Sequence, residues 1–337
     1  MSYEVALDIT RQLPRQLEAT TRDIRRRLGG STAPQVNLRP GELFATRYRI
    51  REDGTPIAIG ATLIYQATDQ TTGQNVILKM TNQTEYFPLY DNEIDVLRQN
   101  ISPVFPALVE YGQLQDSFGR KTEFIAMEEI EGIELRALLR GDPIPLSQAI
   151  ETTMMVLFGL RSLHTAGFIH RDLKPSNIMI AGNGETRLLD FGITCKNGHR
   201  DAEAVVGTPS YISPEQVRNE PVGPGSDFYS LGLVLYEMMA GYNPMRTPDN
   251  DPLTVANNIG HNPVPALPRE AVTRGLSAEA VRDLGTKIDS VHQRLRAINA
   301  RMTELNISER YQGASAIIDQ LHRLLPDIKE LEQYGWV

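Results

Sequence analysis

The stretch FIHRDLKPSNIMI, residues 168 to 180, places a polar core between two apolar flanks. Its core holds a carboxylate, an ammonium group and an amide at Asp172, Lys174 and Asn177. A solvated turn with a chance run of charge is the simplest explanation, but a loop that only connects two elements needs no such set. We therefore interpret the stretch as a catalytic loop that its apolar flanks hold in place.

A second motif follows at LLDFGIT, residues 188 to 194, which reads as a strand leading into Asp190. Such a turn is common by itself, but this one follows Asp172 by 18 residues, with the short turn AGNGET between them. The resulting hairpin would bring Asn177 and Asp190 to one point. Amide and carboxylate oxygens are hard ligands that suit Mg²⁺, so the sequence predicts a magnesium site.

These motifs resemble those of the eukaryotic-like Ser/Thr protein kinases, especially the bacterial members. The family's catalytic loop is intact from His170 to Asn177, and its Asp-Phe-Gly motif stands at Asp190–Gly192. The strand VILKM carries the family's phosphate-binding lysine at Lys79, and NEIDVL carries its helix partner at Glu93. The resemblance covers the chain from about residue 41 to residue 325.

Three further matches lie in the second half of the chain. The segment GTPSYISPEQ, residues 207 to 216, resembles the end of the family's activation segment. Asp227 matches the residue that braces the catalytic loop in the family, and Arg310 matches the partner of Glu215.

The resemblance implies phosphoryl transfer from ATP, in which catalysis is mostly positioning and charge stabilisation. Asp172 would accept the proton of the substrate hydroxyl, and Lys174 would face the γ-phosphate. Lys79 would bind the α- and β-phosphates while paired with Glu93; Glu85 is the alternative partner, but Glu93 continues the helical pattern of its segment. Two residues would hold the Mg²⁺ ion that bridges the phosphates: Asn177 and Asp190.

The resemblance also implies an adenine site. The Glu128 carbonyl and the Ile130 amide would meet the adenine edge, and Ile77 stands where the family usually has a small alanine, which predicts a tight site. The other implied residues are Ile64 above the base, Met179 beneath it and the gatekeeper Met127. Of the glycine-rich loop that covers the phosphates only Gly60 remains, since other residues stand at the family's glycine positions: Ile57, Ile59 and Thr62.

The hydrophobic period changes along the chain, from short β-like runs after Gly41 to helical patterns after Gly132. We predict an α+β, bilobal protein-kinase fold with a β-rich N-lobe containing one helix and a larger helical C-lobe. The predicted boundaries are 1–40 for an N-terminal helical extension and linker, 41–131 for the N-lobe, 132–326 for the C-lobe and 327–337 for a tail.

An apolar stripe at spacings of three and four residues runs from Val281 to Leu305. It predicts a helical insertion at about 277–305, roughly 40 Å long as one helix and too long to lie wholly on the lobe. We expect the N-terminal helix or a second protomer to cover the projecting part of the stripe. The alternative is two shorter antiparallel helices with a break near Asn299.

Composition limits the function classes. The chain has 337 residues, 41% of them hydrophobic, and a net charge of −8, which argues against nucleic acid as the main partner. A single cysteine, Cys195, excludes internal disulfides and cysteine-based metal clusters. No run of about 18 apolar residues occurs, so we expect a cytoplasmic protein without a membrane span.

We therefore predict a protein kinase that phosphorylates Ser and Thr of protein substrates and of itself. A pseudokinase or scaffold with weak nucleotide binding is one alternative, motivated by the eroded glycine loop, and a small-molecule phosphotransferase is another. Residues 195–207 contain no Ser, Thr or Tyr, so we expect a fixed carboxylate, Asp201 or Glu203, to replace an activating phosphate, or activation from elsewhere. The N-terminal segment is expected to dock on the kinase or on a partner protein.

Overall fold

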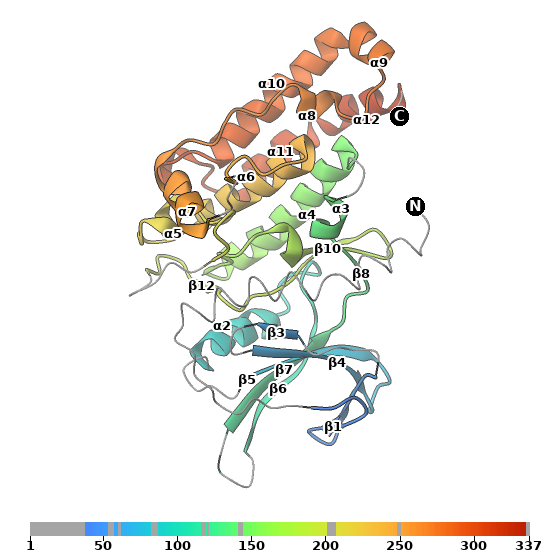
Figure 1. The fold of residues 1–337 in the computed structure, drawn as a ribbon, viewed down its shortest axis with the longest axis vertical. Coiled ribbons are helices and arrows are strands. Elements are labelled where there is room, and N and C mark those ends of the chain that lie inside the picture. The colour runs from blue at the N-terminus through green and yellow to red at the C-terminus, as the bar shows by residue number, and fades with distance from the viewer. Residues whose placement is uncertain are drawn as a thin grey trace. The chain divides into compact units, whose positions relative to one another are not determined.

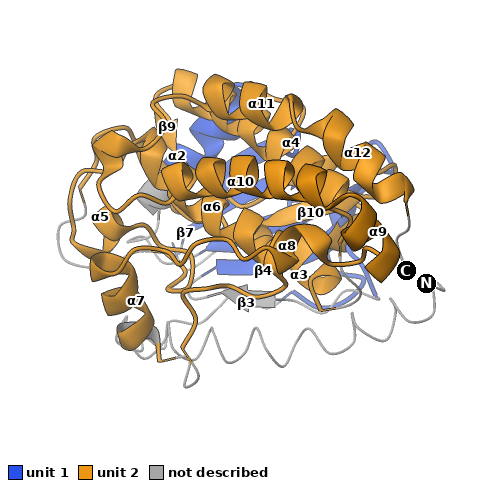
Figure 2. Cartoon of the chain, turned by 90° about the horizontal axis from the view of Figure 1, so that it is seen from above, with its two compact units in different colours: residues 1–100, 106–130 blue, residues 101–105, 131–337 orange. Residues whose placement is uncertain are grey.

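The computed structural model describes residues 38–52, 57–59, 62–81, 87–115, 119, 121–140, 144–200, 207–247 and 251–334. The chain divides into two compact units, coloured separately in Figure 2. Unit 1 comprises residues 1–100 and 106–130, and unit 2 comprises residues 101–105 and 131–337. The N-terminal helix predicted within residues 1–40 lies, up to residue 37, outside the described residues.

Unit 1 is built on an antiparallel sheet of seven strands, whose order is β1-β2-β4-β5-β7-β6 with β3 paired to β4 (Figure 1). One helix, α2 (Phe87–Arg98), contacts β6 and β7. The strands are β1 (Leu43–Phe44), β2 (Tyr48–Ile50), β3 (Ile57–Ile59), β4 (Thr62–Asp69), β5 (Asn75–Thr81), β6 (Leu108–Gln115) and β7 (Lys121–Glu128).

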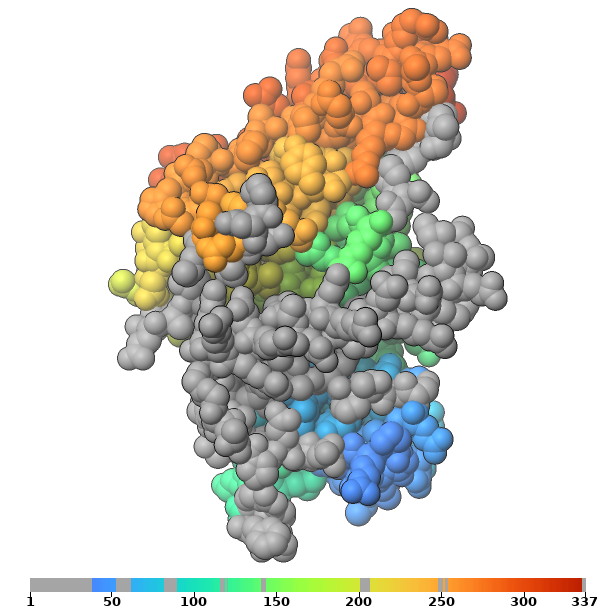
Figure 3. All heavy atoms as spheres, viewed as in Figure 1, coloured from blue at the N-terminus to red at the C-terminus, as the bar shows by residue number. Residues whose placement is uncertain are grey.

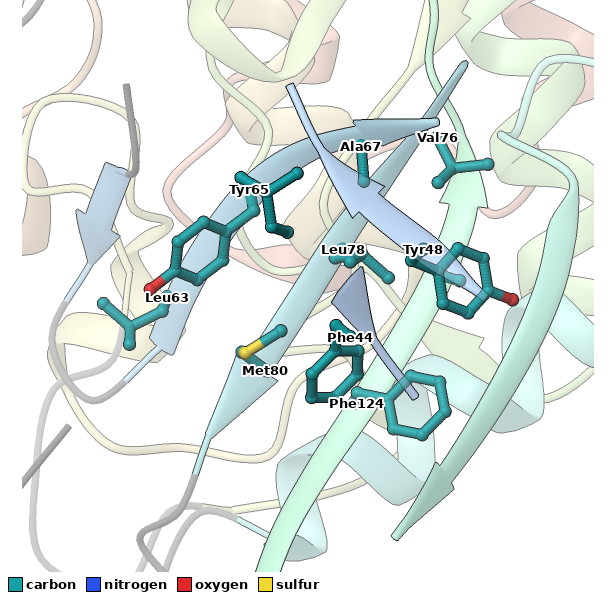
Figure 4. Packing of buried hydrophobic residues seen from close by; sticks show 11 residues of the cluster. Phe44, Tyr48, Leu63, Tyr65, Ala67, Val76, Leu78, Met80 and Phe124 are labelled. Atoms are coloured by element: carbon teal, nitrogen blue, oxygen red, sulfur yellow. The ribbon is translucent and has the colours of Figure 1, made fainter. Parts of the chain in front are cut away.

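The two faces of this sheet differ because successive side chains of a strand point to opposite sides. In β4 every second residue is buried, and three of these, Leu63, Tyr65 and Ala67, join side chains of β1, β2, β5 and β7 in one apolar cluster (Figure 4). Phe44 and Tyr48 both pack edge-on against Phe124 within it. The opposite face of β4 and β5 therefore carries Ile64, Ile77 and Lys79.

Unit 2 is mainly helical, with a three-stranded sheet in the order β11-β10-β8 and a two-stranded ladder of β12 and β9. Its central helix, α6 (Pro224–Ala240), is buried from Gly225 to Met239, and α4 (Leu146–Thr165) packs on it (Figure 1). The remaining elements are β8 (Gly132–Glu134), α3 (Leu135–Leu138), β9 (Phe168–Ile169), η2 (Pro175–Asn177), β10 (Ile178–Ala181), β11 (Thr186–Leu188), β12 (Cys195–Lys196), α5 (Pro214–Val217), α7 (Pro252–His261), α8 (Glu270–Thr273), α9 (Ala278–Asp283), α10 (Gly285–Met302), η3 (Ile307–Glu309), α11 (Ala314–His322) and α12 (Leu325–Gln333).

The predicted division into a β-rich part and a helical part is thus confirmed. The range predicted as a tail, 327–337, is helical as far as Gln333, because it belongs to α12, which packs on α4 and α10. Among the residues that the structure describes, no helix combines the length and apolarity needed to cross a membrane.

The apolar stripe from Val281 to Leu305 does not form one helix. The chain leaves helical geometry at Leu284, whose φ and ψ are −106° and 16°, so α9 ends at Asp283 and α10 begins at Gly285. Glycine is the weakest helix former after proline, which makes this a low-cost place for the break. The residues of α9 and α10 are drawn in orange in the space-filling view (Figure 3).

The prediction that the N-terminal helix or a second protomer covers the apolar stripe is wrong over the length of α10. The helices α6, α8, α11 and α12 of the same unit pack on α10, so neither the N-terminal segment nor a second protomer is needed there. The buried side chains of the stripe in α10 are Ile288, Val291, Leu295, Ile298 and Met302.

The alternative of a break near Asn299 is also wrong, because α10 continues to Met302. Asn299 is buried, and its Nδ2 atom donates a 2.8 Å hydrogen bond to the carbonyl of Gly232 on α6. A Cβ atom at Gly232 would lie 2.5 Å from Cγ2 of Thr303. The two helices therefore approach closely at a glycine and are joined there by a hydrogen bond.

A pair of glycine substitutions tests this packing. Gly232→Ala should destabilise the fold by about 1–3 kcal/mol, the usual cost of overpacking, because the Thr303 side chain is held by its own bond to Asn299 and has little room to move. Gly285→Ala should have no cost or stabilise slightly, because nothing lies within 4 Å of its Cβ position. Urea unfolding of both variants measures the difference, and equal stability would contradict the close approach.

Candidate active site

One carboxylate of α6 fixes the backbone of the catalytic loop through hydrogen bonds. Asp227 accepts hydrogen bonds from the backbone N–H groups of His170 and Arg171, both at 2.9 Å, and it contacts Nε2 of His164 at 2.7 Å. Arg171 has a φ of 71°, which a non-glycine residue rarely adopts. The bonds from Asp227 thus hold the loop in a conformation that the chain would otherwise avoid.

Asp227 remains ionised in this position. It is fully buried, and burial by itself would raise its pKa. The hydrogen bonds from His164 and from the backbone N–H of Arg171 act in the opposite direction, and the pKa of Asp227 lies below its ordinary value.

The carboxylate of Asp172, a residue of this loop, accepts hydrogen bonds from two side chains. Nζ of Lys174 donates to its Oδ2 atom at 2.5 Å, and the hydroxyl of Thr208 donates to its Oδ1 atom at 2.7 Å. Lys174 also donates to the Thr208 oxygen at 2.9 Å. The structure thus joins two residues of the predicted site to a hydroxyl from the segment 207–216.

Asn177 turns its amide nitrogen toward the same carboxylate. Nδ2 donates to the Asp172 carbonyl at 2.8 Å and to its Oδ2 atom at 3.2 Å. No donor among the described residues bonds to Oδ1 of Asn177, so this oxygen is available as a ligand.

The hairpin of β10 and β11 brings Asp190 next to Asn177, as the sequence predicts. Ile178 pairs with Leu188, and the N–H of Leu189 donates to the Asn177 carbonyl at 2.8 Å. Asp190 follows directly with a φ of 60°, and its Oδ1 atom accepts from the N–H of Gly192 at 3.2 Å. An amide oxygen and a carboxylate therefore stand at the end of one short hairpin.

Asn177 and Asp190 supply too few ligands to enclose a metal ion, but they suit a magnesium ion that also binds water and phosphate. The described residues contain no group of three or more His, Cys, Asp or Glu side chains that could enclose a metal. Mg²⁺ commonly takes one or two protein oxygens and completes its shell with waters and substrate phosphates. Asn177 and Asp190 match that requirement.

His170 is a buried, neutral support rather than an acid or base. Its Nδ1 atom accepts from the N–H of Asp172 at 3.3 Å, its Nε2 atom lies 3.3 Å from the Leu189 carbonyl, and its ring packs on Phe191. Burial lowers the pKa of His170, although nearby carboxylates act in the opposite direction. One ring thus connects the catalytic loop with the Asp-Phe-Gly turn.

The lowered pKa of His170 predicts a pH dependence of stability. The unfolded state binds a proton below about pH 6.5 and the native state does not, so stability falls as the pH drops below that value, by at most about 1.4 kcal/mol per pH unit. His170→Gln should flatten this part of the profile, measured as unfolding free energy between pH 7 and pH 5. His261→Gln, at an exposed histidine, should not, and an unchanged slope in His170→Gln would contradict the assignment.

In unit 1 Lys79 pairs with Glu93, as predicted, whereas the alternative partner Glu85 lies outside the described residues. Nζ of Lys79 donates to both carboxylate oxygens of Glu93, at 2.9 and 2.8 Å, and both side chains are buried. The pair links the central strand β5 to helix α2.

The residues predicted around adenine share the sheet face of Lys79. Ile64 lies opposite Lys79 in the ladder of β4 and β5, and Ile77 lies opposite Met127 in that of β5 and β7. Directly paired residues of an antiparallel ladder have side chains on the same face, so these four form one surface. Glu128 ends β7, and its N–H and side chain bond to the backbone of Ala107.

The other predicted binding residues are distributed differently. Ile130 is the last residue of unit 1, and Met179 belongs to unit 2, on β10 opposite Glu134. Gly60 and the carboxylates Asp201 and Glu203 lie outside the described residues. Ile57 and Ile59 lie in β3, which pairs with the start of β4.

Sequence reasoning missed two members of this site. Thr208 appears in the sequence only as a hydroxyl near a turn, and its bonds to Asp172 and Lys174 span more than thirty residues. His164 likewise reaches Asp227 across 63 residues. No local spacing signals either contact, because the partners come from different elements.

Comparison with known proteins decides the family. The model of the protein kinase domain matches residues 59–319. The chain belongs to the protein kinase family. The sheet of unit 1 and the helices of unit 2 are thus those of a protein kinase domain.

Individual bacterial relatives agree with this kinase assignment. A probable serine/threonine-protein kinase of Corynebacterium efficiens is 33% identical over 71% of this chain and 38% of its own length. The serine/threonine-protein kinase PknB of Mycolicibacterium smegmatis is 34% identical over 64% of this chain and 36% of its own length. The chain thus spans little more than a third of the length of these relatives.

Proposed function

We propose that this kinase domain transfers the γ-phosphate of Mg-ATP to Ser or Thr hydroxyls of protein substrates, its own included. The observation that carries the proposal is the Asp172 carboxylate, to which an alcohol and an ammonium group are already hydrogen-bonded. The reaction needs ATP, so we place it in the cytoplasm.

In the proposed mechanism Asp172 orients the substrate hydroxyl and accepts its proton. The hydroxyl oxygen forms a bond to the γ-phosphorus while the bond from that phosphorus to the β–γ bridging oxygen breaks, and ADP leaves. Lys174 lies within hydrogen-bond distance of Asp172 and would offset the negative charge of the phosphoryl group.

The remaining roles concern the nucleotide and its metal ion. Lys79 would bind the α- and β-phosphates, with Glu93 holding its ammonium group in place. The face shared by Ile64, Ile77 and Met127 would take the adenine, with the backbone of Glu128 and Ile130 at its edge. Asn177 and Asp190 would hold Mg²⁺, which neutralises phosphate charge when bound.

Two observations disfavour a scaffold without activity. The catalytic side chains are present, and Asp172 is hydrogen-bonded to Lys174, Asn177 and Thr208. Within unit 2 the segment 207–216 is held in place by the hydrogen bonds from Arg310 to Glu215. A segment fixed in this way suits a surface that receives a polypeptide. A small-molecule phosphotransferase would not require that segment.

The test is a transfer assay with purified full chain, labelled ATP and Mg²⁺, offering general protein substrates and the chain itself. Labelled phosphoserine or phosphothreonine is expected. Lys79→Ala should lower the rate by about 10² or more, the scale for one preorganised charge, whereas Lys121→Ala, an exposed lysine of the same unit, should not. Equal rates in both variants, or transfer to small molecules alone, would overturn the proposal.

A further inference from the structure

The carboxylate of Glu129 lies between the two residues whose backbone we assigned to the adenine edge, and the proposed reaction gives it no role. Nη1 of Arg51 donates to its Oε2 atom at 2.8 Å, and Nε2 of Gln66 donates to its Oε1 atom at 2.6 Å. The Glu129 side chain is 10% exposed and that of Arg51 is 25% exposed. Gln66 lies in β4 and Arg51 directly follows β2, so these contacts cross the sheet. We call the three residues the Glu129 clamp.

The Glu129 clamp borders the sheet face assigned to adenine. The N–H of Arg51 donates to the Gln66 carbonyl at 3.0 Å, which extends the ladder of β2 and β4 by one residue. Gln66 lies opposite Ile77 on β5, and Ile77 lies opposite Met127 on β7. Directly paired residues of such ladders have side chains on one face. Glu129 follows Met127 by two residues, and its contacts with Arg51 and Gln66 lie on that face.

The neighbouring residue, Glu128, is fixed toward the opposite edge of the sheet. Its N–H donates to the Ala107 carbonyl at 2.9 Å, and its Oε2 atom accepts from the Ala107 N–H at 3.0 Å. Ala107 directly precedes β6, which forms that edge. The chain after Met127 is thus held toward β6 at Glu128 and toward β4 at Glu129. Two successive residues bound in opposite directions leave the backbone between them little freedom to move.

The direction of these backbone groups decides which base fits. Adenine offers an N6–H donor beside its N1 acceptor, and these suit the Glu128 carbonyl and the Ile130 N–H. Guanine has the O6 acceptor where adenine has the N6–H donor, so its oxygen would face the carbonyl. A site built around hydrogen bonds rejects an analogue that leaves its polar groups unpaired. This rejection requires that the carbonyl and the N–H are held in place.

The Glu129 carboxylate would not keep its position without its partners. An ionised carboxylate that loses its hydrogen bonds in a largely buried position is costly, so Glu129 would turn toward water and take its backbone with it. Glu129 directly joins Glu128 and Ile130, and a turn of its backbone therefore moves both adenine-edge groups. An ion pair that only stabilises the fold would instead affect the free energy of unfolding alone.

We propose that Arg51 and Gln66 act through Glu129 as positioning residues, and that they set the preference of the nucleotide site for ATP over GTP. This inference rests on the proposed function, because it concerns the adenine end of the same site. Neither Arg51 nor Gln66 needs to touch the nucleotide. Their effect is to hold the Glu128 carbonyl and the Ile130 N–H in the direction that adenine requires.

The first test measures nucleotide binding and requires no phosphate transfer. An ATP analogue with a fluorescent group on its ribose is bound to the full chain with Mg²⁺ and displaced by ATP or by GTP. The two competitors carry the same triphosphate and differ only in the base, and the unmodified chain should bind ATP more tightly. Glu129→Ala removes both bonds of the clamp. It should weaken ATP binding by about 3–10-fold, the scale of a single hydrogen bond, and leave GTP binding nearly unchanged.

Charge reversal assigns the effect to the contact between Arg51 and Glu129. Arg51→Glu places two carboxylates together and should lower ATP affinity at least as much as Glu129→Ala. Adding Glu129→Arg restores a pair of opposite charges, with the Gln66 amide oxygen as a further acceptor, and should recover most of the preference for ATP. Arg49→Glu changes an exposed arginine two residues earlier in the chain. It is the matched control and should not change the preference.

Thermal unfolding of each variant separates positioning from stability. Equal binding of ATP and GTP by the unmodified chain would overturn the inference. A ratio of the two affinities that stays constant in Glu129→Ala would also overturn it, whether or not that variant is less stable. So would a charge-reversed pair that recovers stability but not the ratio.

Phosphate transfer to Ser or Thr is measured separately with labelled ATP. A clamp-dependent preference for ATP without any transfer would contradict the proposed function alone. Transfer with the same base preference in the unmodified chain and in every variant would contradict the role of the clamp alone.

Discussion

Replacing Asp172 with asparagine is expected to lower phosphoryl transfer by about 10²–10⁴-fold, the usual contribution of a positioned general base. Asparagine keeps an oxygen that can accept from Thr208 or Lys174, as the carboxylate does. It cannot take the proton of the substrate hydroxyl. We therefore expect kcat to fall while nucleotide affinity and thermal stability stay close to those of the unmodified chain.

Single-turnover kinetics with labelled ATP, together with a nucleotide-binding titration, measures both quantities. Asp289→Asn is the matched control, since that carboxylate is exposed and pairs only with Arg269 among the described residues. Unchanged turnover in Asp172→Asn would show that another group accepts the proton. A joint loss of nucleotide binding and stability would instead indicate a structural role.

The residues of the catalytic loop could be predicted because they are close in sequence. Asp172, Lys174 and Asn177 lie within six residues, and one hairpin carries Asp190 back to them. Short-range geometry of this kind follows from strand pairing and a tight turn. The order and spacing of these residues in the sequence were therefore enough to predict that their side chains lie together.

The cover of α10 could not be predicted in the same way. Spacings of three and four residues identify a buried face but do not say which element buries it. The break at Leu284 leaves the spacing of the stripe unchanged, so periodicity could not reveal it. The close approach at Gly232 depends on a contact with Thr303, about seventy residues away.

The contacts of Glu237 show the same limit. Arg136 meets Glu237 across 101 residues, and Tyr211 meets it across 26. In the sequence Glu237 is simply one acidic residue in the apolar helix α6. Its burial and these two contacts become evident only in the folded chain.

Replacing Arg310 with alanine is expected to destabilise unit 2 by about 3–5 kcal/mol, the cost of removing one partner of a buried ion pair. The Arg310 side chain is 0% exposed and that of Glu215 is 1% exposed. The two guanidinium nitrogens donate to the two carboxylate oxygens at 2.8 and 2.9 Å, and the side chain also donates to three backbone carbonyls: Gly225, Glu304 and Leu305. Without Arg310 the Glu215 charge would stay buried and uncompensated.

The acid side of the stability profile should change as well. Burial by itself would raise the pKa of Glu215, but the hydrogen bonds and charge of Arg310 outweigh it, and the pKa lies below its ordinary value. A carboxylate with a lowered pKa stabilises the fold above its unfolded-state pKa, near 4.3, and loses that contribution as the pH falls below it. Arg310→Ala should therefore lose less stability than the unmodified chain when the pH is lowered from 5 to 3.

Burial, and not the ion pair as such, should cause the large effect. The pair of Arg269 and Asp289 is as short, at 2.6 Å, but its side chains are 40% and 54% exposed. Exposed pairs contribute roughly 0–1 kcal/mol, so Arg269→Ala should cost no more than about 1 kcal/mol in the same urea titration. Arg310→Lys should lower the free energy of unfolding nearly as much as Arg310→Ala. A single ammonium group cannot reach both carboxylate oxygens and three carbonyls at once. If Arg310→Ala and Arg269→Ala lost equal stability, the buried pair would not be holding the segment around Glu215 in place.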